Sequence, residues 1–301
     1  MTNGMHLRQI ITEFAAKNDL VCGVCTAQPL PPDARLTAIP FSEATERERR
    51  DPAILLPGAR SVIVLGAGYA KAADAPADDA PRGVFSAMAV GEDYHTVLAR
   101  HLGALREVLL LAAEFESVSH VDTGPLCERG FALRAGVGFR GRNQYVLSPR
   151  FGPCFNLGLL ITTLEIPPDV PMAQPCEGCG RCIEACPGGA LSADGFDYTR
   201  CASYISQKKG ELAPWEAEIL GEALYGCDVC ARVCPHGQGV ACEVVPADAM
   251  RPQADDILAL TNASFRARFG QTAIGWRGLG VLKRNARNAK YMYKRNTKGG
   301  E

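Results

Sequence analysis

Eight of the thirteen cysteines in this 301-residue chain fall into groups whose spacing limits what the surrounding chain can fold into. In the first group, Cys176, Cys179, Cys182 and Cys186 lie three, three and four residues apart and are followed by Pro187. In the second, Cys227, Cys230 and Cys234 precede Pro235, and Cys201 stands between the groups. The spacing predicts a lobe organised around whatever these sulfur atoms bind.

The first group has the C-x2-C-x2-C-x3-C-P spacing of bacterial ferredoxins with two clusters, in which the fourth cysteine ligates the other cluster. We therefore expect two [4Fe-4S] clusters. One is assigned to Cys176, Cys179, Cys182 and Cys234, and the other to Cys186, Cys201, Cys227 and Cys230. Structural zinc is the alternative, because four thiolates also bind Zn²⁺. Three closely spaced thiolates in each group favour iron–sulfur cubes over zinc hooks.

The other five cysteines are scattered, and we expect them to be small buried residues or incidental thiols: Cys22, Cys25, Cys127, Cys154 and Cys242. With 47% hydrophobic and 22% charged residues, the composition is that of a globular protein. The N-terminus lacks the order of a signal peptide, and no apolar run is long enough to span a membrane. We expect a cytoplasmic protein without a membrane partner, in which cysteines bind metal more often than they form disulfides.

The pattern along the chain predicts an α/β (α+β) fold. Helical periodicity over residues 5–19 and 93–116 alternates with apolar runs of strand length, such as those at 61–66 and in NLGLLITTLE. We expect an α/β lobe over residues 1–168, a ferredoxin-like double-cluster domain over 169–245, and a basic helical segment over 246–301. Prolines at 167, 168 and 171 mark the first boundary.

The C-terminal segment is strongly basic, although the whole chain has a formal net charge of −1. Residues 262–301 hold ten Lys and Arg against a single acid, Glu301. Neutralising phosphates releases counterions, so such a segment favours a polyanionic partner. Aromatic residues among these cations are typical of proteins that stack on unpaired bases. We expect RNA contacts from Lys283, Arg284 and Arg287, and the alternative is a solvated basic end with buried aromatics.

Asp122 is the candidate catalytic residue. In HVDTGPLCERGFALRAG, residues 120–136, an apolar strand delivers Asp122 to its end, and a helix with Glu128 and Arg129 in its first turn follows. A carboxyl group at the mouth of a site can donate or accept a proton. The alternative is that Asp122 caps the following helix.

Several ordered phrases resemble the epoxyqueuosine reductases, which are cobalamin-dependent iron–sulfur enzymes of tRNA queuosine synthesis distantly related to reductive dehalogenases. The phrases are RDPAILLPGARSVIV, VGEDYH, VDTGPLCERGFALRAGVGFRGRN, SPRFGPCFNLGLLITTLEI, CASYISQKKGEL and YGCDVCARVCPH, over about residues 45–290. The resemblance implies a base-off cobalamin held by a corrinoid-binding N-terminal lobe, two clusters that deliver electrons to it, and reduction of epoxyqueuosine to queuosine at the tRNA wobble position.

The resemblance also assigns roles to individual residues. Asp122 would be the proton donor. The corrinoid and substrate pocket would be lined by Arg50, Ser86, Asp93, Tyr94, His95, Asp122, Arg142, Asn143 and Ser203. Gln207, Lys208 and Lys209 would face the RNA. The implied partners are the tRNA anticodon loop and an external low-potential electron donor, and we expect a monomer.

The chain also departs from the family pattern. Arg142 stands where lysine is common, Phe139 where tryptophan is common, CPHG replaces CPWN, and Leu159 lies in a phrase that usually reads F-x-L-G-E. The sequence also ends before the C-terminal extension of many members. Three alternatives stay open: a reductase of the same architecture acting on a small molecule in the manner of a dehalogenase, a plain double-cluster electron-transfer protein, and a zinc-stabilised RNA-binding module.

Overall fold

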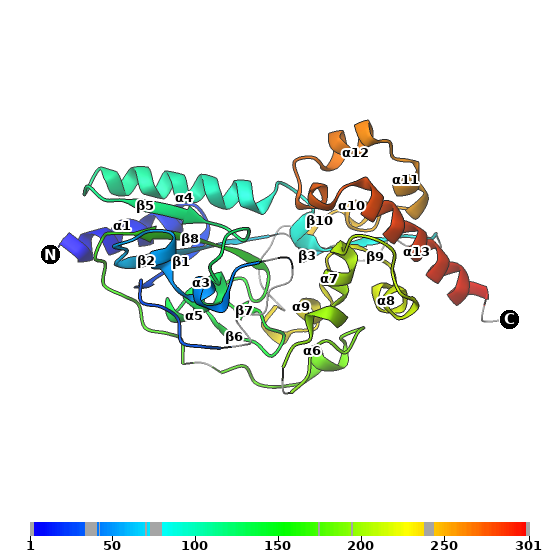
Figure 1. Cartoon of the computed structure of the whole chain (residues 1–301), viewed down its shortest axis with the longest axis horizontal. Coiled ribbons are helices and arrows are strands. Elements are labelled where there is room, and N and C mark those ends of the chain that lie inside the picture. Colours follow the sequence, from blue (N-terminus) through cyan, green and yellow to red (C-terminus); the bar gives the residue numbers. More distant parts are fainter. Residues whose placement is uncertain are drawn as a thin grey trace. The chain divides into compact units, whose positions relative to one another are not determined.

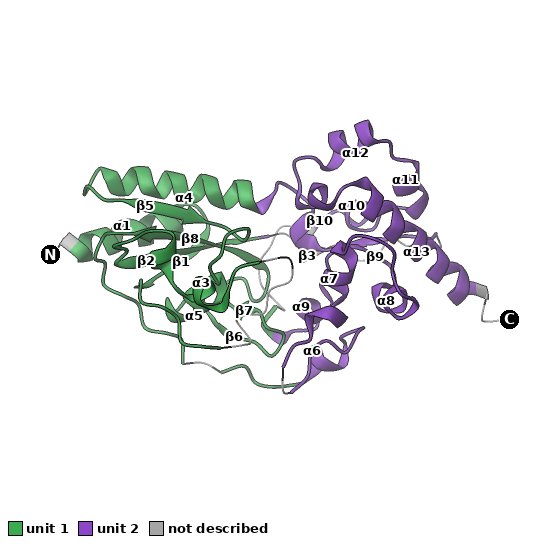
Figure 2. Cartoon of the chain, in the orientation of Figure 1, with its two compact units in different colours: residues 1–68, 95–179, 236–240 green, residues 69–94, 180–235, 241–301 purple. Residues whose placement is uncertain are grey.

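A computed structural model describes residues 3–33, 41, 43–69, 71–72, 80–173, 175–193, 195–237 and 244–298 (Figure 1). The chain forms two compact units, each assembled from separate stretches of sequence (Figure 2). The first comprises residues 1–68, 95–179 and 236–240, and the second comprises 69–94, 180–235 and 241–301. The predicted division into three continuous functional segments stays a prediction.

The first unit is built on a four-stranded sheet in the order β1-β2-β8-β5, in which every neighbouring pair is antiparallel. Its strands are β1 (Leu20–Thr26), β2 (Ser61–Gly68), β5 (Ser117–His120) and β8 (Phe155–Thr162). A small hairpin pairs β6 (Phe139–Arg140) with β7 (Val146–Leu147). The helices are α1 (Asn3–Lys17), α3 (Glu46–Arg50), α5 (Glu128–Arg134) and α4 (Tyr94–Leu110), whose first residue belongs to the second unit, and η1 (Pro52–Ile54) is a 3₁₀ turn.

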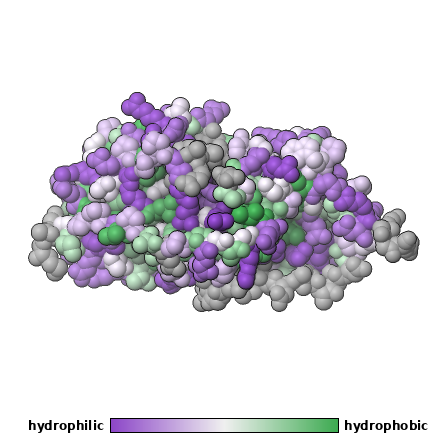
Figure 3. Space-filling view, turned by 90° about the horizontal axis from the view of Figure 1, so that it is seen from below, coloured by the Kyte–Doolittle hydropathy of each residue, from purple (hydrophilic) through white to green (hydrophobic). Residues whose placement is uncertain are grey.

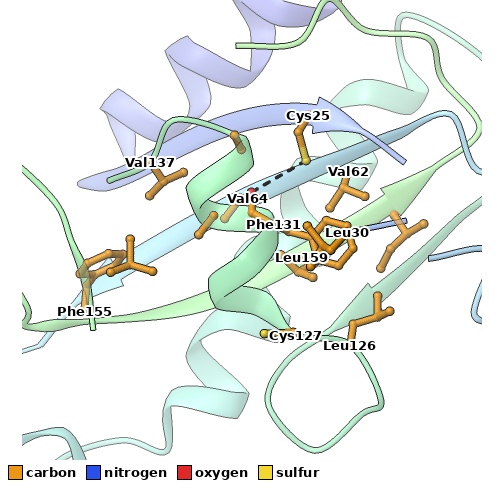
Figure 4. Packing of buried hydrophobic residues seen from close by; sticks show 14 of the residues in the cluster. Cys25, Leu30, Val62, Val64, Leu126, Cys127, Phe131, Val137, Phe155 and Leu159 are labelled. Carbon is orange, nitrogen blue, oxygen red and sulfur yellow. Dashed lines mark hydrogen bonds between the residues drawn. The ribbon is translucent and has the colours of Figure 1, made fainter. Parts of the chain in front are cut away.

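Both faces of the central strands are buried, which explains their almost continuous apolar sequence. On one face, α5 packs over alternate residues of β2 and β8, including Val62, Val64 and Leu159 (Figure 4). On the other face, α1 and α4 pack over the residues between them, including Ile63 and Leu160. This unit therefore has three layers, with helices on both sides of the sheet.

The second unit is largely helical and carries its own apolar core, in which Phe85, Phe265 and Phe269 pack together. Its longer helices are α7 (Ala202–Gln207), α8 (Pro214–Leu220), α11 (Ala254–Ala259), α12 (Asn262–Phe269) and α13 (Leu279–Lys298). Shorter elements are β3 (Lys71–Ala72), β4 (Val84–Phe85), η2 (Ala87–Ala89), α6 (Arg181–Glu184), η3 (Tyr198–Arg200), β9 (Ala223–Tyr225), α9 (Val229–Arg232), β10 (Val244–Val245), α10 (Ala247–Met250) and η5 (Ala273–Arg277). β4 pairs with β9, and β3 with β10.

A buried amide joins α13 to α7 and to β9, the strand that leads into the second cysteine group. Asn285 is fully buried, and its Nδ2 donates to the carbonyls of Ser206 in α7 and Leu224 in β9, at 2.7 Å each. The Ser206 hydroxyl in turn accepts a hydrogen bond from the Gly226 N–H at 2.8 Å. Gly226 directly precedes Cys227, so α13 helps to fix the chain next to a predicted cluster ligand.

The mixed α/β fold class is confirmed, as are the helix near the N-terminus, the strand carrying Cys22 and Cys25, and the basic C-terminal helix. The helix predicted over 93–116 ends earlier, at Leu110. The face shown in Figure 3 mixes hydrophilic residues with small apolar patches. Within the described ranges, no helix is long and apolar enough to cross a membrane.

Replacing Asn285 with Ala should destabilise the second unit, because two buried carbonyls lose their donor. The expected loss in free energy of unfolding is about 1–3 kcal/mol for each carbonyl left unsatisfied. Asn296→Ala, at an exposed position of the same helix, should change it by less than about 0.5 kcal/mol. Urea unfolding followed by circular dichroism measures both, and equal values for the two variants would contradict this account of Asn285.

Candidate functional site

Asp122 lies in the loop that follows β5, in the first unit. Its backbone has φ +51°, in the left-handed region that non-glycine residues seldom adopt. Its carboxylate Oδ2 is 3.4 Å from Nε2 of His95, near the start of α4, and 59% of the Asp122 side chain is exposed. The structure therefore presents an accessible carboxyl group beside an imidazole, at a strained point of the backbone.

A second carboxylate, that of Glu128, holds the backbone of the Asp122 loop. Glu128 Oε1 accepts a 2.6 Å hydrogen bond from the Asp122 backbone N–H and lies 2.8 Å from His120 Nε2. Both side chains of the Glu128–His120 pair are nearly buried. Gly124 is needed beside them, because a Cβ there would lie 2.2 Å from His120 Nδ1. The roles of His120 and Glu128 were not predicted from the sequence, although Glu128 and Arg129 follow soon after D-T-G-P.

Asp122 does not cap α5, so that alternative was wrong. The N-cap residue of α5 is Cys127, and it makes no side-chain capping bond. Arg129, the next residue of α5 after Glu128, holds a different loop, because its Nη1 donates to the carbonyl of Gln144 at 2.9 Å. The first turn of α5 therefore holds two loops: Glu128 binds the loop of Asp122, and Arg129 binds the loop at 140–144.

The 140–144 loop, which carries the predicted pocket residues Arg142 and Asn143, contains buried polar atoms without a partner. They are Nη1 of Arg140, a donor, and Oε1 of Gln144, an acceptor. Asn143 is buried, and its Oδ1 accepts from the Tyr145 N–H. The Arg142 side chain is exposed and lies beside Gly178, between two of the predicted cluster ligands.

Arg50 is engaged within the first unit. Its Nη1 donates to the Leu30 carbonyl at 2.8 Å, and its Nε is 3.4 Å from a carboxylate oxygen of Glu46. These contacts hold the start of the loop after β1 against α3. The predicted role of Arg50 in a pocket stays a prediction.

In the second unit, electrostatic interactions join five of the eight cysteines: Cys182, Cys186, Cys201, Cys227 and Cys230. Four of them are the set that the crossover rule assigned to one cluster, and Cys182 was assigned to the other, so the division into two ligand sets stays a prediction. Burial, with smaller effects from the nearby Cys201, Asp228 and Cys186, raises the pKa of Cys227 to about 11 against a hydrogen bond from the Val229 N–H. If these thiols ionise, the thiolates repel one another, so the donor set fits a cationic iron–sulfur cube.

Backbone N–H groups are directed at these sulfur atoms. The Ala190 N–H lies 3.3 Å from Cys186 Sγ, and Ser203 and Tyr204 at the start of α7 donate to Cys201 Sγ. Such bonds stabilise thiolates and help set a cluster's potential.

The other four cysteines belong to different units. Cys176 and Cys179 are part of the first unit, and Cys182 and Cys234 are part of the second. None of the twelve cysteines that the structure describes forms a disulfide, and Cys242 lies outside the described residues. In the described part of the chain, no three Cys, His, Asp or Glu side chains converge closely enough to hold a single metal ion.

Cys25 shows what an incidental cysteine looks like in this fold. It is buried against α5, and its Sγ donates to the Phe131 carbonyl at 3.8 Å (Figure 4). Burial raises the pKa of this thiol to about 12. Cys127 and Cys154 are buried as well, whereas Cys22 is half-buried near Arg8.

Four predicted pocket residues belong to the second unit. The Ser86 hydroxyl donates to Asp228 Oδ1 at 2.5 Å, and the Ala87 N–H donates to Oδ2 at 2.6 Å. Burial raises the pKa of Asp228, which stands between the ligands of the C-D-V-C motif. The remaining three lie elsewhere in this unit: the Asp93 N–H donates to the Gln271 carbonyl, Tyr94 packs on the core, and Ser203 lies in α7.

Some of the predicted RNA-binding side chains are used within the second unit. Arg284 donates to the carbonyls of Lys208 and Gly210, at 2.6 and 2.7 Å. Lys208 Nζ donates to the buried Glu216 at 2.5 Å. Burial would raise the pKa of Glu216, but bonds from Lys208 and the Ala213 N–H outweigh it and lower the pKa. These contacts fix the Gln-Lys-Lys loop after α7.

Other cations and aromatics of this unit face solvent. Lys209 and Arg287 are exposed, Lys283 is half-buried, and Gln207 bonds back to Ser203. Trp276 and Tyr291 are exposed by 54% and 61%, whereas Phe265 and Phe269 belong to the core. The Arg277 guanidinium stacks 3.4 Å from the Trp276 ring centroid. In the basic segment, Trp276 and Tyr291 are therefore accessible for stacking on bases, whereas Phe265 and Phe269 are buried core residues.

Two departures from the family pattern contact each other. The rings of Phe139 and His236 meet edge to face, with centroids 5.1 Å apart, and His236 Nε2 is 3.9 Å from Glu177. Leu159, a third departure, is fully buried in the core beneath α5. The altered residues are thus accommodated by packing within the first unit.

Comparisons with known proteins agree over most of the chain. Residues 49–123 match a family model described as epoxyqueuosine reductase QueG, DUF1730, and residues 175–237 match a 4Fe-4S double cluster binding domain. An epoxyqueuosine reductase of Bacillus cereus is 36% identical over 256 residues, which cover 82% of this chain and 67% of the relative. A crystal structure of epoxyqueuosine reductase with an epoxyqueuosine-modified tRNA-Tyr stem loop has a TM-score of 0.89 at 31% identity and covers 96% of this chain and 82% of that chain.

A structure of the Bacillus subtilis enzyme, described with its aspartate catalytic loop swung out of the active site, has a TM-score of 0.87 at 30% identity. The alignment covers 97% of this chain and 83% of that chain. The likeness to both solved structures extends over the two units.

Glu128→Ala should release the Asp122 loop. The Asp122 N–H loses its acceptor and the buried His120 loses the carboxylate beside it, which should cost about 1–3 kcal/mol of unfolding free energy. The Asp122 amide should exchange hydrogen faster than in the unaltered protein. Glu114→Ala, at an exposed position, should leave both quantities unchanged. Unaltered exchange at Asp122 in the Glu128 variant would contradict the bracing role.

Proposed function

Because the chain belongs to the epoxyqueuosine reductase family, an oxidoreductase family, we propose that it reduces epoxyqueuosine to queuosine at the wobble position of a tRNA. The observation that carries the proposal is the likeness, over 96% of the chain, to an epoxyqueuosine reductase solved with a modified tRNA stem loop. In this reaction two carbon–oxygen bonds break, a carbon–carbon double bond forms, and oxygen leaves as water. Two electrons and two protons are consumed.

Asp122 supplies a proton to the departing oxygen in this proposal. Its carboxyl group is exposed at the end of a strand, where a substrate can reach it, and His95 lies within 3.4 Å to orient it. The Bacillus subtilis relative, whose aspartate catalytic loop can swing out of the active site, supports a catalytic role for a loop of this kind. In this chain, Glu128 would hold the loop in the catalytic position through the Asp122 N–H.

Two [4Fe-4S] clusters would deliver the electrons. The match to a double-cluster domain supports the clusters, and the nearness of Cys186, Cys201 and Cys227 to Cys230 supports one ligand set, although Cys182 also acts on Cys230. We assign the other set to Cys176, Cys179, Cys182 and Cys234. The hydrogen bonds from backbone N–H groups to Cys186 and Cys201 would adjust the potential of the cluster they surround. An external low-potential donor would reduce them.

A base-off cobalamin is the second cofactor of the proposal. When bound, it would supply the cobalt centre at which the electron transfer to the epoxide takes place. The unpartnered donor of Arg140 and acceptor of Gln144 fit the carboxamide arms of a corrin ring, because an amide both donates and accepts. The residues proposed to line the corrinoid and substrate pocket remain Arg50, Ser86, Asp93, Tyr94, His95, Asp122, Arg142, Asn143 and Ser203.

RNA contact would come from the exposed residues of the second unit. Lys209 and Arg287 are available for phosphates, and Trp276 and Tyr291 offer faces on which a base can stack. Arg284 and Lys208 would act indirectly, because their polar groups already fix the loop before Gly210. The proposed partner is the anticodon loop.

Asp122→Asn should lower the rate of queuosine formation by about 100-fold to 10,000-fold, the usual contribution of a general acid. The assay follows tRNA nucleosides by mass under anaerobic conditions, with cobalamin and a strong reductant. Cluster absorbance and corrinoid binding should match those of the unaltered protein. Full turnover by the variant would remove the proton-donor role.

Cys227→Ser should remove one cluster and leave the other. Iron per chain should fall from about eight to about four, the content of one cube. Cys25→Ser is the matched control, because the Cys25 thiol donates to the Phe131 carbonyl and is not a predicted cluster ligand. The iron content of this variant should equal that of the unaltered protein. Zinc in place of iron in the unaltered protein would contradict both the cluster assignment and the redox proposal.

A further inference from the structure

An exposed apolar stretch of chain leads to the first predicted cluster ligands. In the sequence IPPDVPMAQPC, residues 166–176, Asp169 is the single charged residue. Val170 is 84% exposed, and Met172 is 36% exposed. The exposed neighbours of these two residues are also apolar: Pro171, Ala173 and Pro175. We call these five residues the apolar strip. A continuous run of exposed apolar residues marks an interaction site more often than scattered ones do.

Hydrogen bonds of Asp169 fix the start of the apolar strip to the sheet of the first unit. The Asp169 N–H donates to the carbonyl of Val24, in the edge strand β1, and the Val24 N–H donates to Asp169 Oδ2, at 2.8 Å each. Arg8 of α1 donates to both carboxylate oxygens of Asp169, at 2.9 and 2.8 Å. The charge of Asp169 is therefore paired within the unit, and the strip itself is uncharged.

Close packing and prolines limit the motion of the apolar strip further. Gly136, in the turn after α5, has φ +65°, and a Cβ there would lie 2.4 Å from the carbonyl oxygen of Val170. The backbone of the strip therefore lies directly against this turn. Pro171 and Pro175 fix the backbone angle φ at their own positions. A surface that is already ordered loses less conformational entropy when a partner binds to it.

The apolar strip ends at the most accessible of the predicted cluster ligands. Pro175 directly precedes Cys176, and Cys179 follows three residues later. Among the twelve cysteines that the structure describes, Cys179 alone is exposed. Cys176 and Cys179 both belong to the first unit and to the same predicted ligand set. Because an external donor must approach a cluster closely to transfer an electron, the chain beside the exposed ligand is where we expect it to bind.

We propose that the apolar strip is the docking surface for a small electron-carrier protein with an exposed flavin, of the flavodoxin class. This role rests on the proposed function, because it requires the predicted clusters. Electron-transfer partners bind transiently through interfaces of less than about 1,200 Å² in total, so a short strip is sufficient. Methionine is enriched and charge is depleted at the centre of interfaces. The methyl-bearing edge of a flavin ring is apolar and matches this surface, whereas an RNA backbone requires cations.

The transfer is a one-electron step. The hydroquinone of the carrier's flavin loses one electron, and the iron of a [4Fe-4S] cluster gains it, so no bond forms or breaks. Two such encounters supply the two electrons that the proposed reduction consumes.

The test measures how fast the cluster-loaded, corrinoid-free protein is bleached under anaerobic conditions by a reduced flavodoxin and, separately, by dithionite. Val170→Glu and Met172→Glu place a charge in the strip and should slow reduction by flavodoxin at least about tenfold, the effect of losing one important interface contact. Dithionite is a small ion that needs no docking surface, so its rate should not change. Binding of the oxidised flavodoxin, followed by its flavin fluorescence, should weaken by a similar factor.

Leu111→Glu is the matched control for these variants. Leu111 is 89% exposed and lies in the segment that leads into β5, at the opposite edge of the sheet from β1. The control adds the same charge to the first unit, and its flavodoxin rate should stay within about twofold of the unaltered protein. Val170→Ser removes the apolar contact without adding a charge and should give a smaller decrease in the same direction.

Equal flavodoxin rates in the unaltered protein and the strip variants would overturn the docking proposal. The proposed reduction of epoxyqueuosine would stand in that case, because dithionite would still reduce the clusters. A dimer of the unaltered protein in sedimentation that Val170→Glu dissociates would also overturn it, since a second copy of the chain would then cover the strip. If dithionite does not bleach the unaltered protein, the cluster assignment is wrong and both proposals are lost.

Discussion

The mutual repulsion of closely spaced thiolates is the constraint on which the rest of this structure depends. Cys186, Cys201, Cys227 and Cys230 come from separate turns, yet they interact with one another in a buried region of the second unit. Burial and neighbouring cysteines both raise the pKa of these thiols, so a cationic centre is needed to hold all of them as thiolates. The polar contacts of α13, through Asn285 and Arg284, hold α7 and β9, which lie next to Cys201 and Cys227 in the chain.

In the first unit, a buried carboxylate, that of Glu128, holds the loop that carries the exposed carboxylate of Asp122. Asp122 is useful only if its carboxyl group stays accessible while its backbone remains in an uncommon conformation. Glu128 holds the backbone in this conformation, because it accepts a hydrogen bond from the Asp122 N–H and contacts the buried His120. The exposed carboxylate can then take part in chemistry, while the buried one supports the backbone.

The sequence predicted what depends on local spacing. The apolar periodicity predicted the strand with Cys25 and the basic helix at the C-terminus, and the cysteine intervals predicted the double-cluster domain, whereas the two ligand sets stay a prediction. Contacts between distant residues were not predictable in this way. Glu128 as the brace of Asp122 requires the loop geometry, and the bond from Ser86 to Asp228 joins segments 142 residues apart. Arg284 likewise looked like a surface cation in the sequence, but its donors reach the carbonyls after α7.

The contact between Phe139 and His236 shows how the chain accommodates two departures from the family pattern. Both positions usually carry larger or different rings, and here the two rings pack edge to face.

The central claim is that this protein reduces an epoxide on a tRNA base. The most direct measurement is the mass of the modified nucleoside after anaerobic reaction of epoxyqueuosine-containing tRNA with the cluster-loaded protein, cobalamin and a strong reductant. We predict the loss of one oxygen atom, and an unchanged epoxyqueuosine mass while both clusters and corrinoid are bound would contradict the account.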